Sequence, residues 1–217
     1  MILGKLLHNH AKHHEAGGTI DRPRVYDVVA QVGFLGRRRE IFTRLAALSG
    51  VRPGHQVLDV GCGTGYLTRI LSQVAGHAGH VTGVDHSAPM IEYARGKAPD
   101  NCSYLPGEGQ ELDLPDERFD VVVSSLALHH IPADRRGDAV REMFRVLRPG
   151  GRLLIADYRP PANPLLARLA GLVTGPAMRH DPRESLRELV AQAGFRLQDQ
   201  GDLPMALCYV RAARPAG

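Results

Sequence analysis

The chain has 217 residues, of which 43% are hydrophobic and 23% charged, and this composition suits one globular domain with a sizeable core. The longest apolar stretch, 164–178, is interrupted by Arg168, so the sequence predicts no membrane span. The apolar amino end is too broken for a signal peptide. Three widely separated cysteines without metal-ligand spacing favour a reduced, cytoplasmic protein with no metal site. They are Cys62, Cys102 and Cys208.

A net charge of +4 raises the question of a nucleic-acid partner. The arginines, however, are interspersed with aspartate and glutamate, and no basic stripe carries interleaved aromatic residues. The dense run at 37–39 is explained by a solvated helix face. We therefore expect no nucleic-acid partner.

The first 50 residues are expected to be helical, with one segment at 26–32 and an amphipathic one at 37–48, and to fold over the site as a cap or lid. A second domain is expected at 51–217; from residue 56 onward, strand-like and helix-like segments alternate, which indicates an α/β fold with a mostly parallel sheet. The expected strands are 56–60, 80–84, 102–105, 119–124 and 152–157. The expected helices are 65–75, 88–97, 134–147 and 183–193, the third of them stopped near Arg148 by the Pro-Gly-Gly at 149–151.

Two further strands are expected in the tail, at 195–200 and 206–211, joined by the short connection 201–204. A connection this short cannot form a helical crossover, so the two strands should pair antiparallel. The segment 158–182, rich in proline, glycine and leucine, is expected to be a helical insertion over the same face as the lid.

The most informative motif is VLDVGCGTG at 57–65, which is typical of a buried strand, a glycine turn and a helix start. The glycines let the backbone approach a ligand, and the turn is expected to aim free N–H groups beyond the strand end. A dinucleotide site would place a third glycine at position 66, but the sequence has it at Gly65. Asp59 would also repel a pyrophosphate and would favour an ammonium or sulfonium group.

Two acidic residues follow later strands. Asp85 lies about 20 residues past the turn, where an acid can accept hydrogen bonds from ribose hydroxyls. The alternative role, capping the next helix, is open to Ser87, which leaves Asp85 freer. Glu108 follows the third strand, where it could accept from an adenine amino group or lie in an exposed loop.

Together these residues resemble the class I S-adenosylmethionine-dependent methyltransferases, most closely the branch of the ubiquinone and menaquinone methyltransferases. The matching segments cover most of residues 50–160, in the family's order and spacing. They are VLDVGCGTG (57–65), VTGVDHSAPMIEYAR (81–95), LPDERFDVVVSSLALHHI (114–131) and EMFRVLRPGGRLLIADY (142–158). The resemblance implies a Rossmann-like seven-stranded sheet whose last strand is antiparallel, with helices on both faces.

The resemblance also implies roles toward S-adenosylmethionine. The methionine end would lie against the glycine turn, the ribose against Asp85, and the adenine beside His86 and Glu108, although the family more often has aspartate at the last position. Tyr26 would close over the cofactor. The full set of implied cofactor residues is Tyr26, Asp59, Gly61, Cys62, Gly63, Asp85, His86, Gly107, Glu108, Gly109, Ser124 and Ser125.

Methyl transfer needs alignment above all, and a general base only where the acceptor must lose a proton. The base candidates are His129 and His130, just past the fourth strand at the carboxyl end of the sheet. A packing or capping role is the alternative for both. Asp157 and Tyr158 end the fifth strand at the same edge and could orient an acceptor. The histidines within 8–14 are interpreted as an arm near the acceptor pocket in preference to a metal site.

The sequence thus predicts methyl transfer to a small-molecule acceptor. Two alternatives remain: a protein of this fold that keeps the cofactor for other chemistry, such as a cyclase, and a methyltransferase acting on tRNA or protein. The sequence leaves open the acceptor, the atom that is methylated and the oligomeric state.

Overall fold

The computed structural model describes residues 22–159 and 182–217. The predicted insertion at 158–182 and the histidine-rich arm lie almost wholly outside these residues. The described chain forms a seven-stranded sheet in the order β3-β2-β1-β4-β5-β7-β6. The strands are β1 (Gln56–Val60), β2 (His80–Asp85), β3 (Cys102–Pro106), β4 (Phe119–Ser125), β5 (Leu147–Tyr158), β6 (Arg196–Leu203) and β7 (Leu207–Ala213).

The first five strands pair in parallel, while β7 pairs antiparallel with both β5 and β6. The predicted fold class is therefore confirmed, including the antiparallel last strand. The hairpin is longer than expected: residues 201–203, predicted as the connection, belong to β6. Met205 and Ala206, both with positive φ, turn the chain instead.

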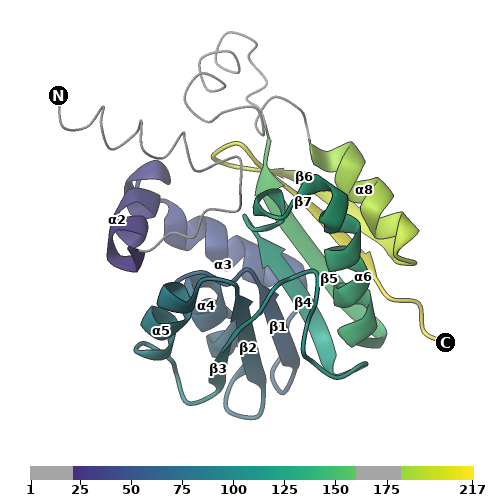
Figure 1. Cartoon of the computed structure of the whole chain (residues 1–217), viewed down its shortest axis with the longest axis horizontal. Coiled ribbons are helices and arrows are strands. Elements are labelled where there is room, and N and C mark those ends of the chain that lie inside the picture. The colour runs from purple at the N-terminus through teal and green to yellow at the C-terminus, as the bar shows by residue number, and fades with distance from the viewer. Residues whose placement is uncertain (1–21, 160–181) are drawn as a thin grey trace, which may run out of the picture.

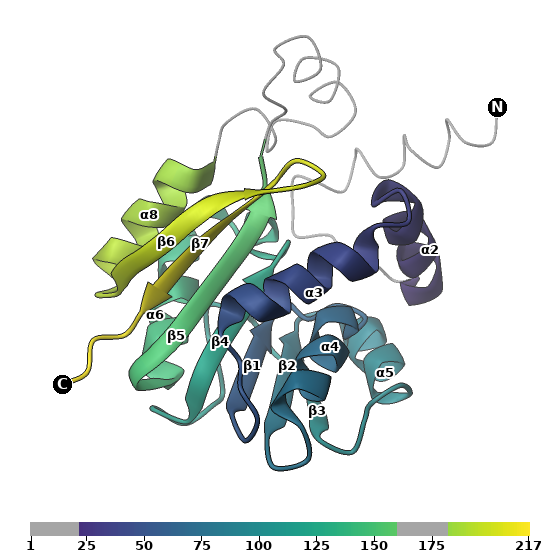
Figure 2. The same cartoon turned by 180° about the vertical axis from the view of Figure 1, so that it is seen from behind.

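Helices cover both faces of this sheet (Figures 1 and 2). On one face lie α6 (Arg136–Val146) and α8 (Pro182–Gln192), and on the other lie α3 (Arg38–Ser49), α4 (Tyr66–Ala75) and α5 (Ala88–Arg95). Alternate residues of each strand enter opposite cores. In β4, Val122 packs with the α6 side and Val121 and Val123 with the α3 side. Both faces are thus buried, as a parallel sheet requires.

The amino-terminal segment divides into two kinds of helix. α2 (Pro23–Gly33) has no buried residue and contacts α5, whereas α3 buries Ile41, Phe42 and Leu45 among the core residues of the sheet. Of these two helices, α2 therefore lies at the periphery, as expected of a lid, whereas α3 packs against the sheet as part of the hydrophobic core (Figure 2). The domain boundary at residue 50 stays a prediction.

The Pro-Gly-Gly segment behaves differently from the prediction. α6 ends at Val146, two residues before the predicted stop, and β5 begins at once with Leu147. The register between β4 and β5 shifts after the first pair, so that residues 148–151 form a bulge within β5.

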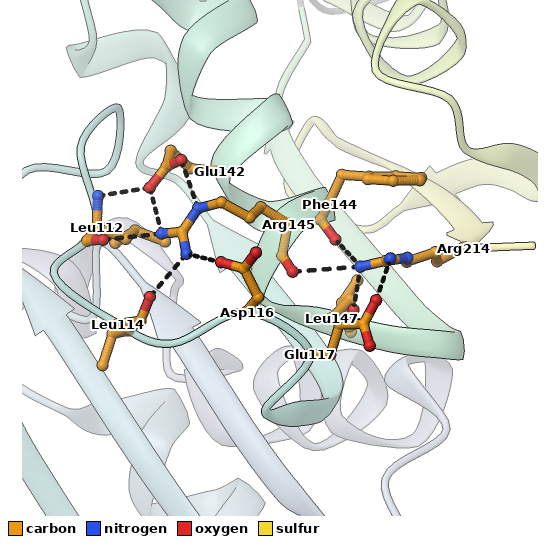
Figure 3. A network of polar contacts seen from close by, with 9 residues as sticks. All are labelled: Leu112, Leu114, Asp116, Glu117, Glu142, Phe144, Arg145, Leu147 and Arg214. Carbon is orange, nitrogen blue, oxygen red and sulfur yellow. Dashed lines mark hydrogen bonds and ion pairs between the residues drawn. The ribbon is translucent and has the colours of Figure 1, made fainter.

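A network of polar contacts closes the amino-terminal edge of the sheet (Figure 3). Arg145, in the last turn of α6, donates to two carbonyls and two carboxylates, and Arg214, just past β7, donates to three carbonyls and one carboxylate. The acceptors of Arg145 are Leu112, Leu114, Asp116 and Glu142, and those of Arg214 are Phe144, Arg145, Leu147 and Glu117. Two arginines thus tie the loop before β4 and the ends of α6 and β7 together.

Among the helices that the structure describes, none is long and apolar enough to cross a membrane.

Candidate functional site

A cavity of about 310 Å³ opens at the carboxyl edge of β1, β2 and β4, a size within the usual range for small-ligand sites. All twelve residues that the resemblance assigned to the cofactor line it, including Tyr26 from α2. A shallower depression between α2 and α5 contains none of them. The structure therefore brings the predicted set together, while the contact that each residue makes with a ligand stays a prediction.

The glycine turn is held mainly by hydrogen bonds within the protein. The N–H groups of Gly61 and Cys62 donate to the carbonyl of Val84, and the N–H of Gly63 donates to Oδ2 of Asp85. The expectation that these N–H groups would be free for a ligand was wrong, because β2 runs close enough to accept them.

The two glycines have different reasons to be there. Gly61 has φ +76°, and a Cβ there would lie 2.1 Å from the Cβ of Ala127. Gly63 has φ +52° and would meet nothing within 4 Å. Gly61 therefore permits close packing against the segment after β4, whereas Gly63 leaves open space in the cavity wall.

Asp59 is the most buried acid of the site, at 1% exposed. Its Oδ2 accepts a hydrogen bond of 2.7 Å from Oγ1 of Thr68, in α4. Burial raises its pKa to about 7, an effect that the Thr68 hydrogen bond reduces and the nearby charge of Asp85 adds to. Near neutral pH this carboxyl group is therefore poised between its two protonation states, and a cationic ligand would favour the ionised one.

Asp85 accepts one backbone hydrogen bond on each carboxylate oxygen. Oδ2 binds the N–H of Gly63 at 2.8 Å, and Oδ1 binds the N–H of Ser87 at 2.9 Å. The Ser87 side chain makes no capping hydrogen bond at α5, so the prediction that it would cap the helix was wrong. Each carboxylate oxygen keeps a second acceptor site, which leaves room for ribose hydroxyls.

The remaining predicted residues vary in exposure. His86 and Glu108 are exposed at the rim of the cavity. Nδ1 of His86 lies 3.7 Å from Oδ1 of Asp85, and Glu108 accepts a hydrogen bond from the side-chain amide of Gln110. Ser124 is 2% exposed at the end of β4. Burial raises the pKa of Tyr26.

Unpartnered polar atoms gather around this cavity. Five buried side-chain atoms without a hydrogen-bond partner among the described residues belong to side chains that line it. They are Arg38 Nε, Ser87 Oγ, Gln110 Oε1, Ser124 Oγ and Ser125 Oγ. Buried polar groups in folded proteins are nearly always bonded, so this concentration fits a polar ligand such as S-adenosylmethionine.

Arg38 corrects the interpretation of the arginine run. Residues 37 and 39 are exposed as expected, but Arg38 is 4% exposed and lines the cavity. Position 38 shares a helix face with 41, 42 and 45, all buried, and this spacing was the signal that the charge pattern obscured.

Asp27 connects the lid helix to this arginine and to the turn. Its Oδ1 accepts from Arg38 at 3.0 Å and from the Thr64 hydroxyl at 2.8 Å, and its Oδ2 accepts from the Tyr93 hydroxyl at 3.1 Å. Burial alone would raise the pKa of Asp27, but the hydrogen bonds from Thr64 and Arg38 outweigh it and lower the pKa. Sequence reasoning did not find this group, because its members lie far apart in the chain.

The two candidate bases differ in their surroundings. Nδ1 of His129 lies 2.6 Å from Oδ1 of Asp157, which is 4% exposed at the end of β5. His130 lines the cavity, and its ring centroid lies 4.0 Å from that of His129. The rings of Tyr158 and His129 lie edge to face with centroids 5.9 Å apart, and burial raises the pKa of Tyr158 to about 12. An imidazole with a buried carboxylate partner thus stands beside the cavity.

Comparisons with known proteins agree with this geometry. A family model described as a methyltransferase domain matches residues 57–151. The ubiquinone/menaquinone biosynthesis C-methyltransferase UbiE of Ectopseudomonas mendocina is 36% identical over 199 residues, covering 78% of this chain and 76% of that protein. UbiE of Azotobacter vinelandii is 35% identical over 199 residues, covering 78% of this chain and 77% of that protein.

Solved structures share the fold. An S-adenosylmethionine-dependent methyltransferase from Aquifex aeolicus superposes with a TM-score of 0.70 at 23% identity, covering 82% of this chain and 93% of that one. The [4+2]-cyclase SpnF superposes with a TM-score of 0.65 at 21% identity, covering 81% and 80%. At these identities the structures show the fold alone.

The sheet, the cavity and the matching domain define a class I S-adenosylmethionine-dependent methyltransferase. Within that class the chain belongs to the UbiE-like family. It is an enzyme that uses S-adenosylmethionine to methylate a small-molecule acceptor.

Proposed function

We propose that the acceptor is a phenolic ring methylated at carbon, and that His129 removes the proton that this reaction releases. The names of the UbiE relatives, which specify C-methylation in quinone biosynthesis, support the acceptor class. The observation that carries the mechanism is the contact between His129 and Asp157 beside the cavity.

The cofactor-binding residues take the roles that the resemblance gives them. Asp59 and the glycine turn hold the methionine end, and Asp85 accepts from the ribose hydroxyls. Bound there, S-adenosylmethionine supplies a methyl group already activated on a sulfonium. The protein's own task is then to align the acceptor and accept its proton, and alignment of this kind is worth about 7–11 kcal/mol.

The contact with Asp157 selects the tautomer of His129. A carboxylate can only accept a hydrogen bond, so in the neutral imidazole the shared proton belongs to Nδ1 and the lone pair lies on Nε2. The acceptor gains one methyl group and loses one proton, which Nε2 takes. Asp157 then stabilises the imidazolium.

The test begins with titration of the protein with S-adenosylmethionine and S-adenosylhomocysteine. Transfer of a radiolabelled methyl group is then measured against hydroxylated benzenes and naphthalenes, with the position of the label determined. His129→Ala should lower turnover about 10²–10⁴-fold at unchanged cofactor affinity. His77 is exposed in the turn between α4 and β2, so His77→Ala is the control and should behave as wild type.

Three outcomes separate the alternatives. Equal turnover in His129→Ala, with a loss in His130→Ala, would transfer the role to His130, which lines the cavity. A label found on oxygen would refute the proposed C-methylation. Binding of the cofactor without transfer to any acceptor would favour a scaffold role of the kind open to a cyclase.

A further inference from the structure

One buried cationic side chain from the described part of the chain lines the cofactor cavity. Among the described residues that line it, Arg38 is the only lysine or arginine. It is the first residue of α3 and is 4% exposed. Burial of a guanidinium is costly unless its charge and its donors find partners.

The contacts of Arg38 leave part of the guanidinium unused. Nη1 donates to Oδ1 and to the carbonyl oxygen of Asp27, at 3.0 and 3.4 Å. The guanidinium carbon lies 4.0 Å from the ring centroid of Tyr66, which fixes its plane. Nε is buried and has no hydrogen-bond partner among the residues that the structure describes. A stacked, planar donor group with an unpaired N–H is suited to a carboxylate.

The positive charge of Arg38 is only partly neutralised, because its carboxylate partner also binds other groups. Its only carboxylate partner, among the described residues, is Asp27, which accepts hydrogen bonds from Thr64 and Tyr93 as well and lies 3.9 Å from Nζ of Lys97. An anion entering the cavity would therefore meet incompletely neutralised positive charge at this point.

The cavity is lined by one basic and one buried acidic side chain, which match the carboxylate and the ammonium group of an α-amino acid. Asp59, at the end of β1, suits an ammonium group, and it bonds to Thr68 in the first turn of α4. Arg38 stacks on Tyr66, the first residue of the same helix, whose positive dipole end also favours an anion. A carboxylate placed toward Asp59 or Asp85 would be repelled, whereas one placed toward Arg38 would be held.

We propose that Arg38 binds the α-carboxylate of the methionine moiety of the cofactor, and that Asp27 holds the guanidinium in place for it. The proposal rests on the cofactor site described above and adds a residue to it. Through Arg38 the enzyme then recognises the amino-acid end of the ligand as well as its nucleoside end.

The test compares two ligands by titration calorimetry: S-adenosylhomocysteine and its decarboxylated analogue, S-adenosyl-3-thiopropylamine. Wild type should bind the first about tenfold to a hundredfold more tightly. Arg38→Gln should lose this difference by weakening S-adenosylhomocysteine while leaving the analogue within about twofold. Arg39→Gln, the exposed neighbour, is the matched control and should keep the wild-type affinities. Arg38→Lys should recover part of the preference.

Each other outcome counts against the proposal. Equal weakening of both ligands in Arg38→Gln would assign Arg38 a structural role. Unchanged affinity for both, with a raised KM for the acceptor, would assign it to an acidic acceptor group. If Arg38→Gln does not fold, a wild type without preference for the carboxylate still overturns the inference. If wild type binds neither ligand, the cofactor site itself is wrong.

Discussion

Asp59 offers a test in which stability and function should move in opposite directions. The carboxyl group is 1% exposed, and it accepts a hydrogen bond from the hydroxyl of Thr68. Burial raises its pKa from 3.8 to about 7. We predict that Asp59→Asn makes the protein more stable at and above neutral pH while weakening its binding of S-adenosylmethionine.

The sign follows from the two pKa values. Below about pH 4 the carboxyl group is neutral in both the folded and the unfolded chain. Between about pH 4 and 7 it is protonated only in the folded chain, so the free energy of unfolding falls as the pH rises. Above about pH 7 it is ionised in both, and the loss is complete. A tenfold change in proton affinity corresponds to about 1.4 kcal/mol, so the full loss is about 4 kcal/mol.

The assay is urea unfolding of wild type and Asp59→Asn at pH values from 4 to 8. The variant carries no titrating group at this position, so its advantage should grow from near zero at pH 4 to about 4 kcal/mol at pH 8. Calorimetry at pH 8 should show weaker cofactor binding, because the charge facing the ligand's ammonium is lost. A stability difference that stays constant across this range would refute the reasoning.

Three other predictions address the turn, the ribose site and the opposite edge. Asp85→Ala should weaken S-adenosylhomocysteine binding by more than about 1 kcal/mol in calorimetry, since it removes an acceptor for two hydroxyls; unchanged affinity would refute the ribose assignment. Gly61→Ala should lower the thermal midpoint, because its Cβ would collide with Ala127, and a wild-type midpoint would show that the turn can shift. Arg145→Ala should destabilise by about 1–3 kcal/mol in urea unfolding, with unaltered cofactor affinity, because it leaves two carbonyl groups unbonded.

The fold could be predicted because its signals are local. A run such as Val121-Val122-Val123 is apolar throughout, as a strand buried on both faces must be. The short connection between the last two strands required an antiparallel pair, and the structure has one. Boundaries were less accurate where tertiary contacts extend a strand, as in β5, whose first residue, Leu147, pairs with Phe119 before the chain bulges.

The site was predictable only where one segment carries it. The glycine turn, Asp59 and Asp85 follow strands of recognisable pattern, so topology places them at one edge. The role of Ser87 was misjudged: its hydroxyl makes no capping bond, while Asp85 accepts the backbone N–H of Ser87 itself. The helical spacing of Arg38 with buried positions 41, 42 and 45 signalled its burial, but its partners could not be predicted, because Asp27 lies eleven residues earlier and Tyr66 on another helix. Such contacts depend on how helices dock, which charge spacing along the chain does not report.

The two edges of the sheet are built on opposite principles. At the amino edge, Arg145 and Arg214 donate hydrogen bonds to carbonyls and carboxylates of the loop before β4 and of the start of β5 (Figure 3). These bonds stabilise the fold. At the carboxyl edge, five buried polar atoms have no partner within 22–159 and 182–217, and burial disfavours the charged form of Asp59. Folding alone gives no reason for this second arrangement, since each unpaired buried group costs free energy. The cost is explained if these groups are arranged for a ligand that carries the missing partners, a carboxylate for Arg38 and an ammonium for Asp59. Substitutions that remove these polar groups, such as Asp59→Asn, should therefore weaken ligand binding and raise stability, whereas Arg145→Ala at the amino edge should lower stability alone.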